Sequence, residues 1–368
     1  MLEGIQVPTL LLDEAKCKRN ILKIAQKAID NQVVIRPHFK THQSHQVGRW
    51  FREAGVNQIT VSSFRMADYF AEDAWNDITV AFPANILEIN RINTLARKIQ
   101  LNLCIENLES LQFLEQHLQA TVGLFLKINA GNNRSGLGLD RMPLIDQMMA
   151  KLQSSNRLDF KGFLGHAGQS YKARSDQEII EAHQYSKDLM QQLKNRFQKS
   201  FPHLILSLGD TPTCSVAQDF TGIDEIRPGN FAYYDVTQAM IGSCTLDEVA
   251  VAMACPVVAK APERNEVILY GGGVHFSKDR VDRPDGTIIF GLLADWTEKG
   301  WTPINESETY MRGLSQEHGV LKTTPERIAR IKIGDLLPVL PVHSCMAADL
   351  MKSVRTLDGQ TFGMLQFV

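Results

Sequence analysis

The sequence contains no long hydrophobic run and no dense set of cysteines. No apolar stretch in its 368 residues reaches the roughly 18–20 residues that cross a bilayer, so we expect no membrane-spanning helix. The N-terminus, Met1-Leu2-Glu3-Gly4-Ile5, lacks the basic and apolar regions of a secretory signal. The six cysteines are scattered along the chain at positions 17, 104, 214, 244, 255 and 345. That is too sparse for a disulfide framework and is typical of a cytoplasmic protein.

A strong charge of either sign is also missing. The formal net charge is −2, so neither a nucleic-acid partner nor an anionic membrane surface is indicated. Hydrophobic residues make up 44% and charged residues 22% of the chain, as is usual for a soluble enzyme. The length suits a barrel with an accessory domain.

Runs typical of strands and helices alternate from about residue 30 to residue 230. We expect strands at 32–36, 58–63, 77–82, 101–106, 123–129, 160–165, 204–208 and 224–227. We expect helices at 44–54, 64–73, 85–98, 107–118, 141–154, 175–199 and 212–219. Eight strands that alternate with helices predict an α/β fold, a (β/α)8 TIM barrel, rather than a doubly wound sheet, because no glycine fingerprint follows the first strand.

The pattern changes after residue 235. Short β-runs with turns follow at 247–259, 265–270, 287–293, 309–313, 331–340 and 361–367. We therefore expect a barrel at 10–235 and a smaller, mostly β domain at 236–368, and residues 1–9 are candidates for joining the β domain.

Glycine and polar residues gather where the later barrel strands are expected to end. Gly209-Asp210-Thr211-Pro212-Thr213 follows the seventh strand and Arg227-Pro228-Gly229-Asn230 follows the eighth. Both segments are rich in backbone N–H groups and hydroxyls. The loops after strands seven and eight are where barrels commonly hold a phosphate.

Lys40 stands just beyond the expected end of the first strand. It lies in Arg36-Pro37-His38-Phe39-Lys40-Thr41-His42, directly after the β-branched run at residues 33–35. Neighbouring cations favour the neutral form of an amine, which is a nucleophile for carbonyl groups. This is the chemistry of a Schiff base with pyridoxal phosphate, although most lysines at strand ends are simply solvated.

His343 and Cys345 form a His-x-Cys pair near the C-terminus. We expect them on a strand, where residues i and i+2 share a face and can reach one ion. Imidazole and thiolate suit zinc. With two ligands only, the remaining positions would be open to water and substrate. The histidines His38, His42 and His45 could be read as a second metal cluster, but we expect them to pack around Lys40.

Several segments together resemble the D-serine dehydratase/D-threonine aldolase family of fold-type III, alanine-racemase-like pyridoxal-phosphate enzymes. They extend from residue 36 to residue 345: Arg36 to His42, His166-Ala167-Gly168-Gln169-Ser170-Tyr171, Asp210 to Thr213, Arg227 to Asn230, Ser315-Gln316-Glu317-His318-Gly319 and Pro341-Val342-His343-Ser344-Cys345. The resemblance implies a homodimer with pyridoxal 5′-phosphate and a divalent metal, zinc or manganese, acting on β-hydroxy-D-amino acids.

Site residues also follow from the resemblance. It implies that Lys40 carries the cofactor, that His38 and Arg134 lie near it, and that its phosphate is held by Tyr171, Thr211, Gly229 and Asn230. His343 and Cys345 match the metal pair. Leu164 and Tyr270 differ from residues common in such proteins, which indicates a different substrate.

The resemblance leaves the reaction open. Cys345 favours β-elimination to a 2-oxo acid and ammonia, as in dehydratases, because well-known aldolases have an aspartate there. Aldolase cleavage to glycine and an aldehyde is the alternative. A racemase, or a non-catalytic carrier of the cofactor, is a further one.

Overall fold

The computed structural model describes residues 3–304 and 306–366. The chain forms two compact units. The barrel unit comprises residues 22–40 and 49–229, and the β unit comprises residues 1–21, 41–48 and 230–368. Helices α1 (Glu14–Asp30) and α2 (His45–Glu53) each contribute to both units.

The barrel unit contains the eight parallel strands that the sequence predicts. They are β2 (Val34–Ile35), β3 (Ile59–Val61), β4 (Asp77–Pro83), β5 (Gln100–Ile105), β6 (Val122–Ile128), β7 (Leu158–Gly165), β8 (Ile205–Leu208) and β9 (Glu225–Ile226). Their spatial order is β2-β9-β8-β7-β6-β5-β4-β3. A parallel bridge between His38 and Thr60 links the two ends, so the sheet curls into a barrel.

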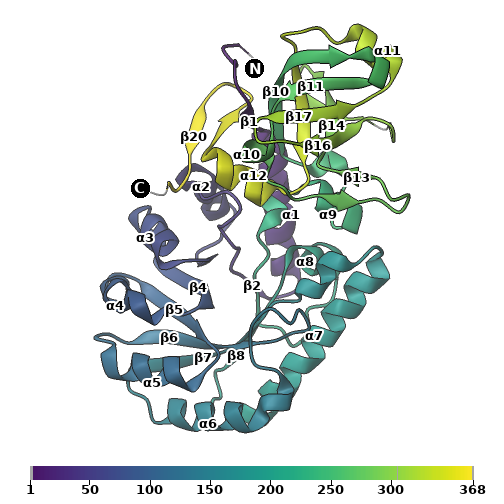
Figure 1. The fold of residues 1–368 in the computed structure, drawn as a ribbon. Coiled ribbons are helices and arrows are strands. Elements are labelled where there is room, and N and C mark those ends of the chain that lie inside the picture. Colours follow the sequence, from purple (N-terminus) through teal and green to yellow (C-terminus); the bar gives the residue numbers. More distant parts are fainter. Residues whose placement is uncertain (1–2, 305, 367–368) are drawn as a thin grey trace. The chain divides into compact units, whose positions relative to one another are not determined.

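Helices cover the outside of this sheet, as Figure 1 shows for α5, α6 and α7. The helices of the unit are α3 (Phe64–Glu72), α4 (Ile89–Ala96), α5 (Leu108–His117), α6 (Met142–Gln153), α7 (Asp176–Phe197) and α8 (Thr211–Val216). Strand β6 is buried along its whole length, as expected for a parallel strand packed on both faces. The α/β barrel prediction is confirmed.

The β unit is built around an antiparallel barrel. Strands β11 (Glu266–Tyr270), β17 (His318–Lys322), β16 (Tyr310–Leu314), β14 (Gly291–Thr297), β18 (Leu336–Pro341) and β10 (Val251–Ala261) pair in this order. Strand β10 also pairs with β11 and closes the circle. A β-bulge between Val257 and Ala259 bends β10, so its first part pairs with β18 and its second part with β11.

Further strands extend this sheet. They are β1 (Thr9–Leu12), β19 (Ser353–Thr356), β20 (Thr361–Gly363) and β15 (Gly300–Pro303), while β12 (Val281–Asp282) and β13 (Ile288–Ile289) pair separately. Four helices complete the unit: α9 (Val236–Ile241), α10 (Gly273–Phe276), α11 (Pro325–Arg330) and α12 (Ser344–Met351). Strand β1 pairs with β10 and β19, so the N-terminal segment belongs to the β unit.

Two of the expected segments include residues outside the described part of the chain. These are residues 1 and 2 in the N-terminal segment 1–9, and residues 305, 367 and 368 in the β domain at 236–368. Within the described part of the chain, no helix has both the length and the apolar character needed to cross a bilayer.

Candidate active site

Lys40 follows a firmly anchored aromatic residue at the carboxyl end of β2. The Phe39 ring is fully buried and packs on Phe51, Phe70 and Trp75, with ring centroids 4.9, 4.9 and 5.1 Å away. The Phe39 backbone N–H donates to the Thr60 carbonyl at 2.9 Å. Lys40 is itself exposed, and its backbone N–H donates to His38 Nδ1 at 3.3 Å. The packing of Phe39 therefore fixes the backbone from which Lys40 projects.

Two histidines beside Lys40 are held neutral. Burial, together with the positive charges of Lys40, Arg227 and Arg134, lowers the pKa of His38 well below its ordinary value. Burial also lowers the pKa of His166 to about 3, and its Nδ1 lies 3.2 Å from the Gly209 carbonyl. Neutral imidazoles can each donate one hydrogen bond and accept another.

Three residues that the sequence predicts as phosphate ligands are joined by hydrogen bonds. The backbone N–H of Gly229 donates to Thr211 Oγ1 at 3.3 Å, and the backbone N–H of Thr211 donates to the Tyr171 hydroxyl at 3.5 Å. Tyr171 lies on the 3-10 helix η3 (Gly168–Lys172) that follows β7. These residues follow β7, β8 and β9; the loop pattern indicated the segments after β8 and β9, whereas Tyr171 after β7 was implied by the family resemblance alone.

Asn230, the fourth expected phosphate ligand, belongs to the β unit. Its side-chain Nδ2 donates to Asp235 Oδ2 at 2.7 Å and approaches Cys345 Sγ at 3.6 Å. Its amide side chain thus contacts the cysteine of the expected metal pair, a relationship that sequence reasoning did not anticipate.

The expected metal pair does not lie on a strand, and that prediction is wrong. Strand β18 ends at Pro341, His343 is the N-cap residue of α12, and Cys345 lies in the first turn of that helix. The two side chains nevertheless form a hydrogen bond, because a helix start brings neighbouring residues together.

Polar groups of the β unit surround this pair. His343 Nδ1 lies 2.6 Å from Asp279 Oδ2, and Cys345 Sγ lies 3.2 Å from Thr41 Oγ1. Burial alone would lower the pKa of His343, but the hydrogen bond and charge of Cys345, with Asp235 and Asp279, raise it to about 10. The negative charge of Asp235 and Asp279 near this pair would also favour a divalent cation.

The pair stands alone as a donor set. Within residues 3–304 and 306–366, no group of three or more His, Cys, Asp or Glu side chains could hold a metal ion. A metal held by His343 and Cys345 would have to take its remaining ligands from water or substrate. Open positions of this kind distinguish catalytic from structural zinc.

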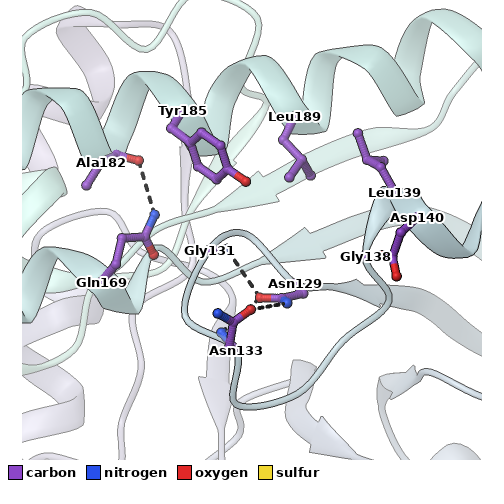
Figure 2. A pocket seen from close by; sticks show the side chains of 10 residues that line it. All are labelled: Asn129, Gly131, Asn133, Gly138, Leu139, Asp140, Gln169, Ala182, Tyr185 and Leu189. Atoms are coloured by element: carbon purple, nitrogen blue, oxygen red, sulfur yellow. Dashed lines mark hydrogen bonds between the residues drawn. The ribbon is translucent and has the colours of Figure 1, made fainter.

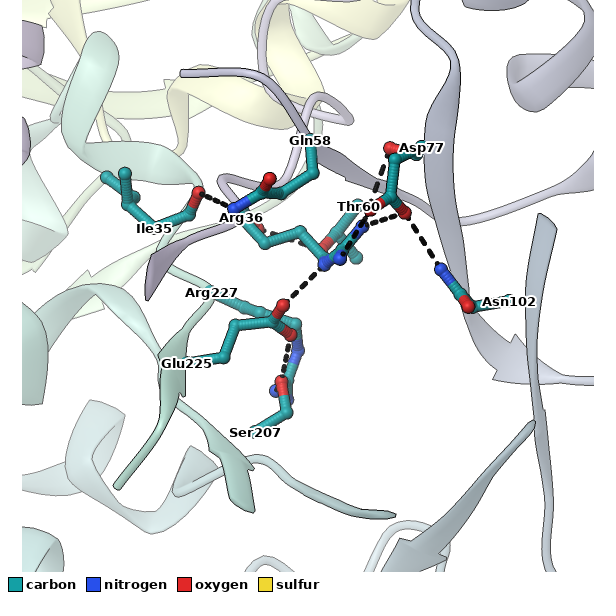
Figure 3. A network of polar contacts seen from close by, with 9 residues as sticks. All are labelled: Ile35, Arg36, Gln58, Thr60, Asp77, Asn102, Ser207, Glu225 and Arg227. Carbon is teal, nitrogen blue, oxygen red and sulfur yellow. Dashed lines mark hydrogen bonds and ion pairs between the residues drawn. The ribbon is translucent and has the colours of Figure 1, made fainter. Parts of the chain in front are cut away.

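A network of buried charges, shown in Figure 3, crosses the inside of the barrel unit. The Arg36 guanidinium contacts Glu225 and Asp77, both at 2.6 Å. Ser207 Oγ donates to Glu225, and Arg227 donates to Ser207 Oγ and to the Gly165 carbonyl. Arg227 is thereby oriented among the cations around Lys40.

The sequence indicated Arg36 and Arg227 only as members of motifs, with no role for their side chains, and it did not indicate Glu225. The alternation Glu225-Ile226-Arg227 could have revealed two charged residues on one face of a buried strand. Lys127 on β6 was also missed. It is only 4% exposed, and burial lowers its pKa, with Arg227 and Arg134 nearby.

One cleft of the barrel unit lies beside the loop that follows β6. Figure 2 shows this pocket of about 510 Å³ between that loop and helix α7. Asn129 Oδ1 accepts hydrogen bonds from the backbone N–H groups of Gly131 and Asn133 and shapes the loop. None of the predicted site residues lines this pocket, but Arg134, in the same loop, borders a much smaller cavity with Lys127 and His166.

In sum, the barrel unit brings together His38, Lys40, Arg134, Tyr171, Thr211 and Gly229. The β unit brings together Asn230, His343 and Cys345. The first set fits pyridoxal phosphate: it offers a lysine, surplus positive charge for an anionic phosphate, and a cradle of hydroxyl and N–H groups.

Comparison with known proteins now identifies the family. Residues 12–236 match the family model of the alanine racemase N-terminal domain, and residues 250–357 match the model of a serine dehydratase domain. The chain belongs to the alanine racemase N-terminal domain family.

Individual relatives cover almost the whole chain. The D-serine dehydratase of Dictyostelium discoideum is 26% identical over 388 residues, which is 97% of this chain and 94% of that protein. The D-threo-3-hydroxyaspartate dehydratase of Delftia sp. is 25% identical and covers 93% of this chain and 91% of its own. The solved structure of the Delftia enzyme has a TM-score of 0.91 and covers 99% of both chains at 24% identity, which shows the shared fold.

Proposed function

We propose that this protein is a lyase that requires pyridoxal phosphate and a divalent metal and acts on β-hydroxy-D-amino acids. The favoured reaction is β-elimination to a 2-oxo acid and ammonia. The observation that carries this proposal is the pairing of His343 with Cys345 in a chain that also presents Lys40 among cations. A barrel with a lysine that carries the cofactor would suit several reactions. Two side chains that hold a metal would add a means of activating a hydroxyl group.

Lys40 would carry the cofactor through Nζ. Tyr171, Thr211, Gly229 and Asn230 would hold its phosphate, and His38 and Arg134 would border its ring. When bound, pyridoxal phosphate withdraws electrons from the substrate Cα and makes the Cα proton acidic. Once the substrate amine has replaced Lys40 on the cofactor, the freed Nζ would accept that proton.

His343 and Cys345 would hold the metal, with zinc preferred over manganese for an imidazole and thiolate set. A divalent ion there supplies Lewis acidity toward the substrate β-hydroxyl. Thr41 and Asn230 contact the sulfur, and a hydrogen bond to a thiolate spreads its charge and fixes its position. A solved structure of a D-threo-3-hydroxyaspartate dehydratase in which alanine replaces a cysteine is of the metal-free form.

The alternative is aldolase cleavage to glycine and an aldehyde. The solved D-threonine aldolase of Filomicrobium marinum has a TM-score of 0.82 at 16% identity, so the fold also occurs with that activity. Cys345 favours elimination by its resemblance to the dehydratases.

A product assay tests the proposal. The purified protein, loaded with pyridoxal phosphate and zinc, is incubated with D-serine, D-threonine, the 3-hydroxyaspartates and their L enantiomers. We expect 2-oxo acid and ammonia from D substrates only. Release of neither 2-oxo acid nor glycine from any D substrate would overturn the lyase assignment.

We also propose a cytoplasmic homodimer. All six cysteines are free thiols and lie in the described part of the chain, which suits a reducing compartment. The dimer rests on the family resemblance. Light scattering on the eluted protein should give about twice the chain mass of 41.3 kDa, and a monomer mass would contradict it.

A further inference from the structure

Asp279 is the one carboxylate in direct contact with the imidazole of His343 among the described residues. Its Oδ2 lies 2.6 Å from His343 Nδ1. Asp279 follows α10 and is held by Ser277, whose Oγ donates to Asp279 Oδ2 and accepts from the Asp279 backbone N–H, both at 3.1 Å. The carboxylate is therefore positioned before any ligand arrives.

This contact determines which imidazole nitrogen is available. A carboxylate that accepts a hydrogen bond from Nδ1–H keeps the proton on Nδ1, so the proton that a metal displaces is the one on Nε2. Nε2 is then the ring nitrogen left for the metal that Cys345, in the first turn of the helix that His343 caps, would also hold.

Neighbouring carboxylates do not share this role. Asp235 Oδ2 accepts from Asn230 Nδ2, at 2.7 Å, and from the Ser344 backbone N–H, at 3.0 Å. Asp235 Oδ1 accepts from the backbone N–H of Gln238. Its hydrogen bonds thus cap α9 and fix the start of α12. Asp279 is also not a third metal ligand, because no three-residue donor group exists in the described ranges.

We propose that Asp279 is a positioning residue that orients His343 so that Nε2 binds the divalent metal held with Cys345. The inference rests on the metal site of the proposed function. It extends that function by naming the residue that sets the orientation and electron density of the imidazole ligand.

The test measures zinc affinity rather than turnover. The protein loaded with pyridoxal phosphate is titrated with zinc against a chromophoric chelator, for the unchanged protein and for Asp279→Ala and Asp279→Asn. Loss of such a carboxylate typically weakens metal binding about 10- to 100-fold, which is the result expected for Asp279→Ala. Asp279→Asn should be weakened less, because its amide oxygen can still accept the Nδ1–H hydrogen bond.

Cobalt substitution gives a second readout. The visible spectrum of the Co²⁺ protein should keep its thiolate-to-metal band in Asp279→Ala, while the ligand-field bands shift as the imidazole turns. The matched control is Asp282→Asn, which removes an exposed carboxylate three residues away that pairs with Arg280. Its zinc affinity should stay within about twofold of the unchanged protein.

The outcomes separate the two claims. If the unchanged protein binds zinc and Asp279→Ala binds it equally well, the role of Asp279 is wrong and the metal site stands. If the unchanged protein binds no zinc, or if Cys345→Ser binds zinc as tightly as the unchanged protein does, the metal site and the role of Asp279 are both wrong. Should Asp279→Ala fail to fold, equal affinity in Asp279→Asn together with an unchanged cobalt spectrum would overturn the proposal.

Discussion

Thr41 Oγ1 and Cys345 Sγ lie 3.2 Å apart, although 304 residues separate them in the chain. Both side chains are buried. Thr41 directly follows Lys40, so the residue proposed to carry the cofactor and a residue that touches the proposed metal ligand are consecutive. A hydroxyl in this position can donate to a thiolate and reduce its basicity.

Replacing Thr41 with valine should therefore weaken the metal site without removing it. Valine keeps the shape of threonine but cannot donate to Cys345. The loss of one hydrogen bond worth about 1 kcal/mol corresponds to a zinc affinity about fivefold lower. Chelator competition measures it, with Thr94→Val, an exposed threonine on α4, as the control. Equal affinity in Thr41→Val would show that the contact is only packing.

The loaded protein should be yellow, with an absorption maximum at about 420 nm that arises from the lysine-bound cofactor. Borohydride reduction should then label Lys40. The competing residue is Lys127, a buried lysine on β6 of the barrel unit. We expect Lys40→Ala to abolish labelling and Lys127→Met to retain it at Lys40. Label on Lys127 in the unchanged protein would refute the assignment of Lys40.

Removing the metal should abolish turnover but leave the cofactor bound. The reason is that the phosphate cradle of Tyr171, Thr211 and Gly229 is held together by its own hydrogen bonds, which involve neither His343 nor Cys345. Activity on D-serine and absorbance at about 420 nm are followed together during chelation. Full activity after chelation would argue against a catalytic metal, and bleaching would indicate that the metal maintains the structure instead.

Acid should destabilise the cofactor-free protein through His166. Burial lowers the pKa of this group to about 3, below its unfolded value, so the unfolded chain binds more protons between about pH 3 and 6.5. The stabilising contribution is complete above this window and is lost as pH falls through it. Urea unfolding of His166→Gln should show a smaller loss over this range, by on the order of 2 kcal/mol. The exposed His203→Gln variant is the control, and equal pH slopes in both variants would disprove the role.

The barrel and its cradle could be predicted from sequence because local signals determine them. β-branched runs ending in glycine and polar loops predicted where Lys40, Thr211 and Gly229 would lie. His343 and Cys345 were predicted to act together, but on a strand. The structure instead ends β18 at Pro341 and places His343 as the N-cap residue of helix α12.

Long-range partners could not be predicted in this way. Asp279 and His343 are 64 residues apart, and Glu225 and Arg36 are 189 residues apart. Only tertiary pairing reveals that these buried or half-buried charges have partners. Lys127 was missed because one charged residue within an apolar strand gives no periodic signal.

The choice between elimination and carbon–carbon cleavage is the central claim, and D-threonine tests it most directly. In both proposed reactions the metal would activate the β-hydroxyl, but the two reactions break different bonds at Cα. The loaded enzyme is incubated with D-threonine, and all four candidate products are quantified by chromatography. The account predicts 2-oxobutyrate with an equal amount of ammonia, and Lys40→Ala should form none. Glycine with an equal amount of acetaldehyde as the main products would contradict it and assign the aldolase reaction to this site.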